Sequence, residues 1–284
     1  MDLKLIADSL NSSFTTSLVG ALAGAFAGAY AAQKVANRSK VKDQLTSELR
    51  HINAAVSISF GVTNTALMAK GQHIKPLRDK YLSEVNRHKE WMERRRTGQI
   101  QGNVPYELSM NLTFIPRVFT TIEPLKSLVF TSVQASSKVV NLLLSLEDYL
   151  QQLDRSIENR HRMINEFKER RFPAGAEEVH IYLGLPFGDG HRSVEYGATL
   201  DAMSQYVDDV IFYSSELAKE LSARGKEVQA RYRRLFNDPP PEVSSIDLSI
   251  AKERGLLPPA ERYEDWLSAF RKTDERIAWW QRDA

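Results

Sequence analysis

Apolar side chains recur every three or four positions between residues 42 and 70, which is the spacing of one face of an α-helix. They are Leu45, Leu49, Ile52, Val56 and Phe60. A second periodic stretch follows Pro76 and ends near residue 96. Gly71 lies between the two stretches, and glycine ends many helices, whereas proline favours a first turn. We therefore expect two helices joined as an antiparallel hairpin.

The period changes to two between Pro105 and Pro116. Apolar and polar residues alternate strictly from Tyr106 to Phe114, which is typical of a β-strand with one buried face. A lone strand needs a partner for its backbone groups. Residues 179–185 are rich in β-branched and aromatic side chains and are the expected partner. The alternative is an extended segment lying across a helical bundle.

Helical periodicity returns in the remainder of the chain. Residues 125 to about 171 contain no glycine or proline and predict one long central helix. A further helix is expected from about residue 200, ending near Gly225 or running on to Arg234. Asn237 to Pro241 form a stop and a stiff linker. The expected fold is mainly α, a long-helix bundle with at most a small two-stranded β element.

The N-terminal region is apolar without being periodic. No charged residue occurs between Ser9 and Gln33. A helix over residues 14–32 would be about 28 Å long, close to the thickness of the hydrocarbon core of a bilayer. We therefore predict a short arm (residues 1–13) and a transmembrane helix (residues 14–33). Two alternatives stay open: a buried alanine-rich helix of a soluble protein, and a cleaved signal peptide ending near residues 29–31.

Basic residues follow this segment without an acid before Asp43. They are Lys34, Arg38, Lys40 and Lys42, and we expect them to set the topology or to meet lipid headgroups. Their excess places the C-terminal side in the cytoplasm and the chain in a cell inner membrane as a single-pass protein. Residues 34–237 would form a cytoplasmic helical domain, followed by a Pro-rich linker and an amphipathic helix (residues 238–284).

Three glycines, Gly20, Gly24 and Gly28, are spaced four apart within the apolar segment. On a helix they form one smooth stripe, which lets a second helix approach closely. The stripe predicts transmembrane association, either between copies of the chain in a homo-oligomer or with a membrane protein partner. Small residues are also common in membrane helices that have no partner.

Large aromatic residues gather near the C-terminus. They are Trp266, Phe270, Trp279 and Trp280. Such side chains dock a terminus onto a core, contact a partner or rest at a membrane surface. Docking onto the core is the simplest interpretation, and partner binding is a weaker hypothesis.

Composition changes this picture little. The chain has 284 residues, a formal net charge of +2 and no cysteine. Disulfides, thiolate catalysis and cysteine-ligated metals are therefore excluded. Near-neutrality argues against a protein that coats nucleic acid. The mean hydropathy of −0.38 is too polar for a multi-pass membrane protein.

Candidate chemistry is sparse. The six histidines form no short metal motif, although His180 and His191 flank a glycine-rich loop. Residues 183–190 lack the GK[ST] ending of a phosphate-binding loop and suit a tight turn better. The pair Asp208-Asp209 is expected to face solvent. Two basic clusters, at residues 94–96 and 231–234, fit either helix ends or lipid headgroups. We expect no enzyme activity, cofactor or metal.

These patterns predict a membrane-anchored, non-enzymatic helical scaffold or sensor. It would associate through the small-residue face of its transmembrane helix. The alternative is a membrane-perturbing effector, for example in bacterial defence or toxicity, triggered through the cytoplasmic domain. A third hypothesis is an enzyme that uses the loop at residues 172–194.

Overall fold

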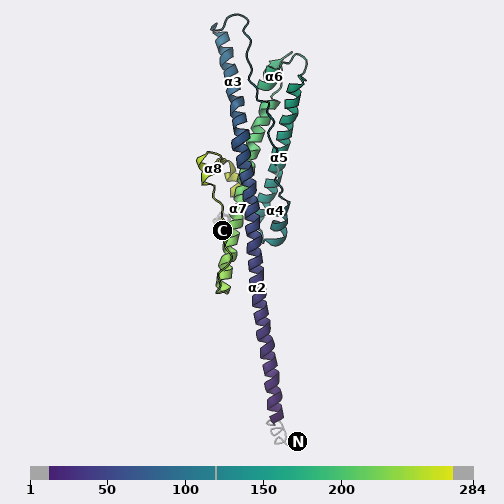
Figure 1. Cartoon of the computed structure of the whole chain (residues 1–284), viewed down its shortest axis with the longest axis vertical. Helices are drawn as coiled ribbons and strands as arrows, with labels where there is room; N and C mark the ends of the chain where they lie inside the picture. The colour runs from purple at the N-terminus through teal and green to yellow at the C-terminus, as the bar shows by residue number, and fades with distance from the viewer. Residues whose placement is uncertain (1–12, 119, 271–284) are drawn as a thin grey trace, which may run out of the picture. The chain divides into compact units, whose positions relative to one another are not determined.

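A computed structural model describes residues 13–118 and 120–270, with side chains from residue 17 onward (Figure 1). The helical elements are α2 (Ser13–Ala69), η1 (Lys70–Ile74), α3 (Lys75–Arg96), α4 (Glu123–Ser127), η2 (Leu128–Ser132), α5 (Ser137–Lys168), α6 (Glu178–Leu183), α7 (Glu195–Leu235), α8 (Ser249–Glu253), η3 (Ala260–Tyr263) and α9 (Glu264–Ser268). The strands β1 (Pro186–Phe187) and β2 (His191–Arg192) pair antiparallel. The fold is mainly α, as the periodicity predicts, and the described part contains one small two-stranded sheet.

The expected hairpin at Gly71 is wrong. Residues 13–96 form one uninterrupted helical run, in which a π-helical turn, η1, joins α2 to α3. The Lys75 amide donates to the Lys70 carbonyl, five residues back, instead of four as in an α-helix. Pro76 then occupies the first turn of α3, where its missing N–H is tolerated. The π turn thus continues the helix past Gly71, and Pro76 lies where its missing N–H costs least.

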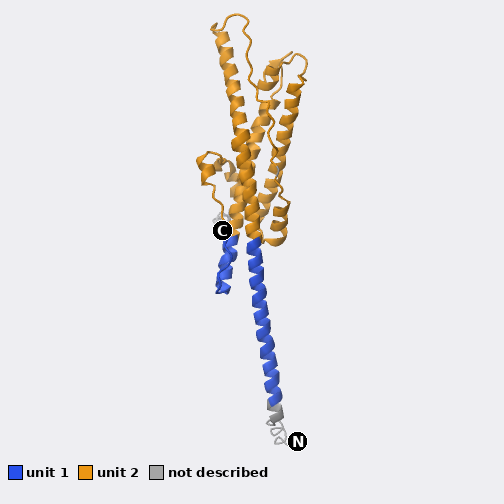
Figure 2. Ribbon diagram, viewed as in Figure 1, with its two compact units in different colours: residues 1–50, 225–243 blue, residues 51–224, 244–284 orange. Residues whose placement is uncertain are grey.

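The chain divides into two compact units (Figure 2). Unit 1 comprises residues 1–50 and 225–243 and pairs the N-terminal part of α2 with the last turns of α7. Its buried apolar side chains come from both helices: Leu45, Leu49, Val228, Tyr232 and Phe236. This core begins only at residue 45 of α2.

Unit 2 comprises residues 51–224 and 244–284. Its core is formed by one apolar face from each long helix. These faces contain Ile52, Ala55, Val56, Val62 and Ala66 of α2; Leu142, Leu143, Leu146, Leu153 and Ile157 of α5; and Met203, Val207, Val210, Ile211, Leu217 and Leu221 of α7. A hydroxyl pair, Thr63 and Ser214, lies within this apolar packing with its oxygens 2.8 Å apart. Unit 2 is therefore a helical bundle held by ordinary burial.

The predicted strand at residues 106–114 is extended but unpaired with any described strand. Side chains of neighbouring helices bind its backbone instead: Arg160 donates to the carbonyls of Asn111 and Thr113 at 2.9 and 2.8 Å. The carboxylate of Glu84 accepts from the Ser109 amide at 2.9 Å. The pairing with residues 179–185 is thus wrong, and the alternative of an extended segment across a bundle is correct.

The expected partner strand is the helix α6. Glu177 and His180 form a reciprocal capping box at its start, and Gly184 ends it in the left-handed conformation with φ of 66°. These two end signals fix a helix over residues whose β propensity favours a strand. The observed hairpin lies just beyond α6, with Gly188 and Gly190 at positive φ between its strands.

The long helix predicted from residue 125 is interrupted. Val133 is extended, and the Ser136 hydroxyl accepts from the Val139 amide at 3.3 Å to begin α5. The later helix, α7, runs past Gly225 to Leu235. The Pro-rich stretch from Asn237 stops α7, as expected. Beyond it the described chain forms only short helical turns.

Candidate functional site

The first half of α2 has no cover from the described chain. Every residue from 17 to 40 is exposed. The exposed set includes large apolar side chains: Leu18, Val19, Leu22, Phe26, Tyr30 and Val35, with Phe26 at 74%. A contiguous apolar surface on a continuous helix marks an interaction with lipid or with another protein. The alternative of a buried soluble helix finds no packing partner among the described residues.

The predicted glycine stripe has no role within the described structure. A Cβ added at Gly20, Gly24 or Gly28 would meet no atom within 4 Å. Each glycine in a helix interior costs about 1 kcal/mol relative to alanine in water. The three glycines therefore weaken the helix without aiding the packing of the described residues.

Hydropathy and exposure select different parts of the same helix. The helical run Ser17–Arg96 is long and apolar enough to cross a membrane by length and composition, with a window of mean hydropathy 1.3 that is 44% buried. Residues 17–40 are all exposed, so that window lies further along. Residues 52–69 carry no charge and contain the buried face of α2 in unit 2. Hydropathy thus detects a core helix, and exposure separates the N-terminal segment from it.

The predicted basic residues follow the exposed segment, and two of them contact the end of α7 within unit 1. Arg38 donates to the Leu235 carbonyl at 3.1 Å and lies 5.6 Å from the ring centre of Phe236. Lys34 and Lys40 are exposed. Sequence reasoning did not anticipate that α7 ends beside these residues.

Three residues form a polar contact in unit 1, close to Arg38 along α2. Lys42 pairs with Asp238 at 2.8 Å, and the Tyr232 hydroxyl donates to the same carboxylate at 2.6 Å. The hydrogen bond to Asp238 raises the pKa of Lys42, and Lys42 together with Tyr232 lowers the pKa of Asp238. The contact holds the chain reversal after α7 against α2.

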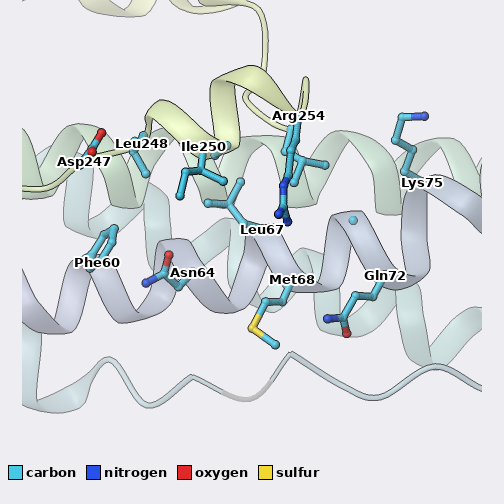
Figure 3. Close-up of a pocket in the computed structure, with 13 residues that line it drawn as sticks. Phe60, Asn64, Leu67, Met68, Gln72, Lys75, Asp247, Leu248, Ile250 and Arg254 are labelled. Carbon is cyan, nitrogen blue, oxygen red and sulfur yellow. The ribbon is translucent and has the colours of Figure 1, made fainter.

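An open groove of about 800 Å³ lies in unit 2 between the end of α2 and α8 (Figure 3). Its apolar side chains include Phe60, Leu67, Met68, Leu248 and Ile250. Met68 and Ile250 are 58% and 63% exposed. Asn64, Gln72, Lys75 and Arg254 supply polar groups at its edges. The lining suits an amphipathic occupant better than a phosphate, which needs several convergent donors.

The aspartate pair does not face solvent as expected. Asp209 is 5% exposed and accepts from Tyr263 at 2.8 Å, and Arg262 lies 3.0 Å away. Asp208 pairs with Lys70 of η1 at 2.6 Å. Burial raises the pKa of Asp209, with Tyr263 and Arg262 acting in the opposite direction. These contacts hold the C-terminal segment and the π turn against α7. The aspartate pair therefore stabilises the fold.

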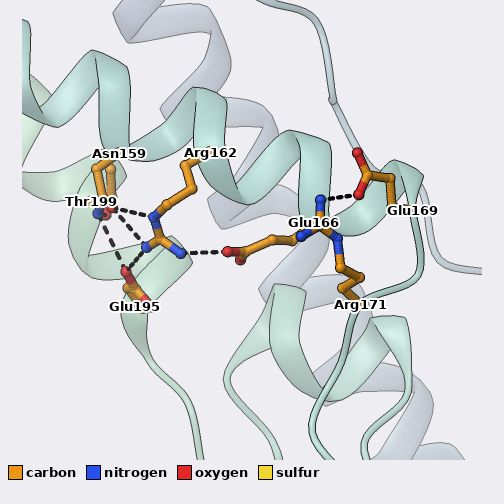
Figure 4. A network of polar contacts seen from close by, with 7 residues as sticks. All are labelled: Asn159, Arg162, Glu166, Glu169, Arg171, Glu195 and Thr199. Carbon is orange, nitrogen blue, oxygen red and sulfur yellow. Dashed lines mark hydrogen bonds and ion pairs between the residues drawn. The ribbon is translucent and has the colours of Figure 1, made fainter.

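A second polar network joins α5 to the first turn of α7 (Figure 4). Arg162 binds Glu166 on its own helix and Glu195 of α7, and Asn159 donates to Thr199 at 3.1 Å. The side chains of Arg162 and Glu195 are about half exposed. Exposed pairs of this kind are each worth less than about 1 kcal/mol. The charged end of α5 is therefore a paired surface that holds two helices in place.

The histidine and glycine loop shows no metal or phosphate geometry. His180 accepts from the Glu177 amide at 3.0 Å as part of the α6 cap, and His191 lies exposed on β2. Within the described residues, no three His, Asp or Glu side chains gather as metal ligands. Pro186 and Phe187 belong to the hairpin, and the glycines serve its turn.

Of the four C-terminal aromatic residues predicted to dock or bind a partner, the structure describes Trp266 and Phe270. Trp266 packs edge-on against Tyr213 of α7 at 5.2 Å between ring centres, and Phe270 lies 4.7 Å from Trp266. Tyr263 stacks on Phe212 at 3.7 Å. Trp279 and Trp280 lie outside the described residues. Partner binding by this group stays a prediction.

No family model, curated protein or solved structure matches the chain.

Proposed function

We propose that this chain is a membrane-anchored, non-enzymatic helical scaffold or sensor. Residues 14–33 would cross a cell inner membrane once, with the helical domain on the cytoplasmic side. The exposure of residues 17–40 carries the proposal, because an apolar helix without cover needs a non-aqueous neighbour. Its backbone hydrogen bonds are satisfied within the helix, as a hydrocarbon environment requires.

The basic residues support the orientation. Lys34, Arg38 and Lys40 follow the span directly, and such an excess favours the cytoplasmic side. The arrangement leaves the helical bundle of unit 2 in water. That surrounding agrees with its polar exterior and with the ion pairs on its surface.

Alkaline extraction of membranes tests the anchor. The intact chain should stay in the membrane pellet, because the span is held by hydrocarbon burial and not by charge. A peripheral protein of known behaviour in the same preparation is the control. Release of the intact chain with that control would refute the anchor.

The glycine stripe is the proposed surface of association, between copies of the chain or with another membrane helix. Small residues let helix backbones approach closely within a bilayer. Replacing Gly20, Gly24 and Gly28 together with leucine should abolish crosslinking between spans while membrane retention persists. Gly61→Leu is the matched control, because Gly61 also lies on α2 with no atom within 4 Å of an added Cβ. Unchanged crosslinking in the triple variant would refute the role of the stripe.

A second candidate function uses the same stripe. If several spans assemble through it and open the bilayer, the chain is a membrane-perturbing effector triggered through its cytoplasmic domain. Expression should then depolarise the membrane, and the triple leucine variant should abolish the effect. A scaffold leaves the membrane potential unchanged in both cases.

A further inference from the structure

Two basic segments far apart in the sequence meet in unit 1. The first follows the exposed apolar part of α2, and the second is the last turn of α7. Arg38 joins them through its hydrogen bond to Leu235, 197 residues away. Seven basic side chains lie on these two segments and are here named the basic collar: Lys34, Arg38, Lys40, Lys42, Arg231, Arg233 and Arg234.

The ordinary explanation of arginines at a helix end is the helix dipole, since cations stabilise unpaired carbonyls there. In α7, Arg38 of the other helix already supplies a donor to the last carbonyl. Arg231, Arg233 and Arg234 are exposed. Across residues 13–118 and 120–270 they take part in no ion pair or hydrogen bond with another side chain.

The end of α3 provides the contrast within the same chain. It finishes in three consecutive arginines, and two of them have partners within α3. Arg96 binds Glu93 twice, at 2.9 and 2.6 Å, and Arg95 lies 5.1 Å from the ring centre of Trp91. The basic end of α3 therefore has partners within its own helix, whereas, among the described residues, the exposed arginines at the end of α7 do not.

The collar keeps its positive charge. The acids within four residues of it along the chain are Asp43, Glu227 and Asp238, and Asp238 is bound by Lys42 at 2.8 Å. Seven basic residues thus outnumber three acids. Such a surface fits an extended anionic partner.

The distance from the apolar segment fits the bilayer surface. Residues 34–42 begin about 3 Å and end about 15 Å beyond residue 32 at 1.5 Å per residue. The headgroup layer is roughly 5–7 Å deep, and the Debye length adds about 8 Å at physiological salt. The collar therefore lies within reach of lipid headgroups if the span is in place.

From this geometry we infer that the basic collar binds the anionic phospholipid headgroups of the leaflet facing the helical domain. The inference rests on the proposed membrane span and adds the end of α7 to the membrane contact. Arg38 and Lys42 hold α7 against α2, and the arginines of α7 face the lipid. Two helices, instead of one, would then fix unit 1 at the membrane surface.

Lipid selectivity of the full-length protein in bilayers tests this inference. The protein is reconstituted in phosphatidylcholine that contains spin-labelled phosphatidylglycerol or spin-labelled phosphatidylcholine, and the two motionally restricted fractions are compared. The variant R231Q/R233Q/R234Q removes the contribution of α7. The control R94Q/R95Q/R96Q removes the same charge from the end of α3. Circular dichroism checks that both variants keep their helix content.

The preference for phosphatidylglycerol should fall by about half in the α7 variant, because three of the seven basic side chains of the collar are removed. The control should keep the preference of the native chain, and high salt should abolish it in all three proteins. An equal fall in both variants, or none in either, would overturn the collar. Absence of any motionally restricted lipid would instead refute the membrane span and hence the proposed function.

Discussion

The two halves of α2 are both rich in apolar residues but have opposite surroundings. Residues 17–40 are exposed throughout, whereas residues 52–69 present a buried face to the bundle. The first half has small residues on one stripe and large apolar residues around it. The second half has large and small buried residues at helical spacing, such as Ile52, Val56 and Val62.

The comparison teaches that apolarity alone does not identify a membrane span. The hydropathy window of this helix is 44% buried, so packing within the bundle explains it. The exposed half has no such explanation within the described chain. Perturbing the two halves in parallel should therefore produce opposite phenotypes.

The largest effect is expected from a charge placed in each half. Ile52→Lys puts an ammonium at a fully buried site of unit 2 and should cost several kcal/mol, enough to abolish cooperative thermal unfolding. Leu22→Lys lies at the middle of the proposed span and should leave the bundle folded. Its insertion cost is about 3 kcal/mol, so retention after alkaline extraction should fall.

Thermal unfolding in detergent and membrane retention are measured on both variants, and each variant serves as the control for the other. If Leu22→Lys also unfolds the bundle, the first half belongs to the core. If it neither unfolds the protein nor weakens retention, the first half lies in water.

A smaller effect is expected at the end of the buried half. Lys70→Met removes the closer partner of Asp208, which then keeps only Arg262 at 3.9 Å, and also removes the hydrogen bond to the Leu256 carbonyl, at a cost of about 3 kcal/mol. Lys75→Met removes the exposed pair with Asp79 and should cost less than about 0.5 kcal/mol. Chemical denaturation measures both. Equal stability of the two variants would show that the ion pair at the π turn contributes nothing.

Glycine replacement sharpens the comparison further. Gly61→Ala lies in the packed half with free space around it and should stabilise unit 2 by about 0.5–1 kcal/mol through helix propensity. Gly24→Ala has equal space but lies in the half without a core, so the unfolding midpoint of the bundle should not move. A rise for Gly24→Ala as large as that for Gly61→Ala would mean that the exposed half unfolds together with the bundle.

The smallest effect concerns pH at the contact between Lys42 and Asp238. The pKa of Asp238 is lowered in the folded chain, so its contribution is present above the usual value near 3.8 and is lost as pH falls through the lowered value. The pKa of Lys42 is raised above 10.5, so its contribution is lost as pH rises through the raised value. Titration by NMR of the side chains of Tyr232 and Lys42 should show the contact intact between about pH 4 and pH 10. Opening near neutral pH would contradict this pairing.

Sequence periodicity located most helices because burial in this fold follows helical faces. Leu45, Leu49 and Ile52 were selected by spacing and are buried. The alternation at residues 106–110 also reports burial correctly, since Tyr106, Leu108 and Met110 are half-buried. The spacing of residues could not predict what binds the backbone of this segment, because side chains such as Arg160 take the place of a neighbouring strand.

The errors arise where a long-range contact or a local cap overrides a local signal. Gly71 as a stop and Pro76 as a first-turn residue predict a break between two helices, but a π turn carries the helix through this region. Asp208 is only partly exposed, and it pairs with Lys70, which is far away in sequence. The meeting of Arg38 with Leu235 joins two basic clusters that look unrelated in the sequence. The sequence indicates only that one cluster follows the N-terminal apolar segment and that the other ends a predicted helix.

The most direct test of the account is the accessibility of single cysteines across the proposed span, since the native chain contains no cysteine. Asp8→Cys, Ala25→Cys and Asp43→Cys are treated with a membrane-impermeant maleimide in intact spheroplasts and after lysis. We predict that the residue-8 variant is labelled in intact spheroplasts, the residue-43 variant only after lysis, and the residue-25 variant in neither case. Labelling of all three variants only after lysis would show that residues 14–33 do not cross the membrane.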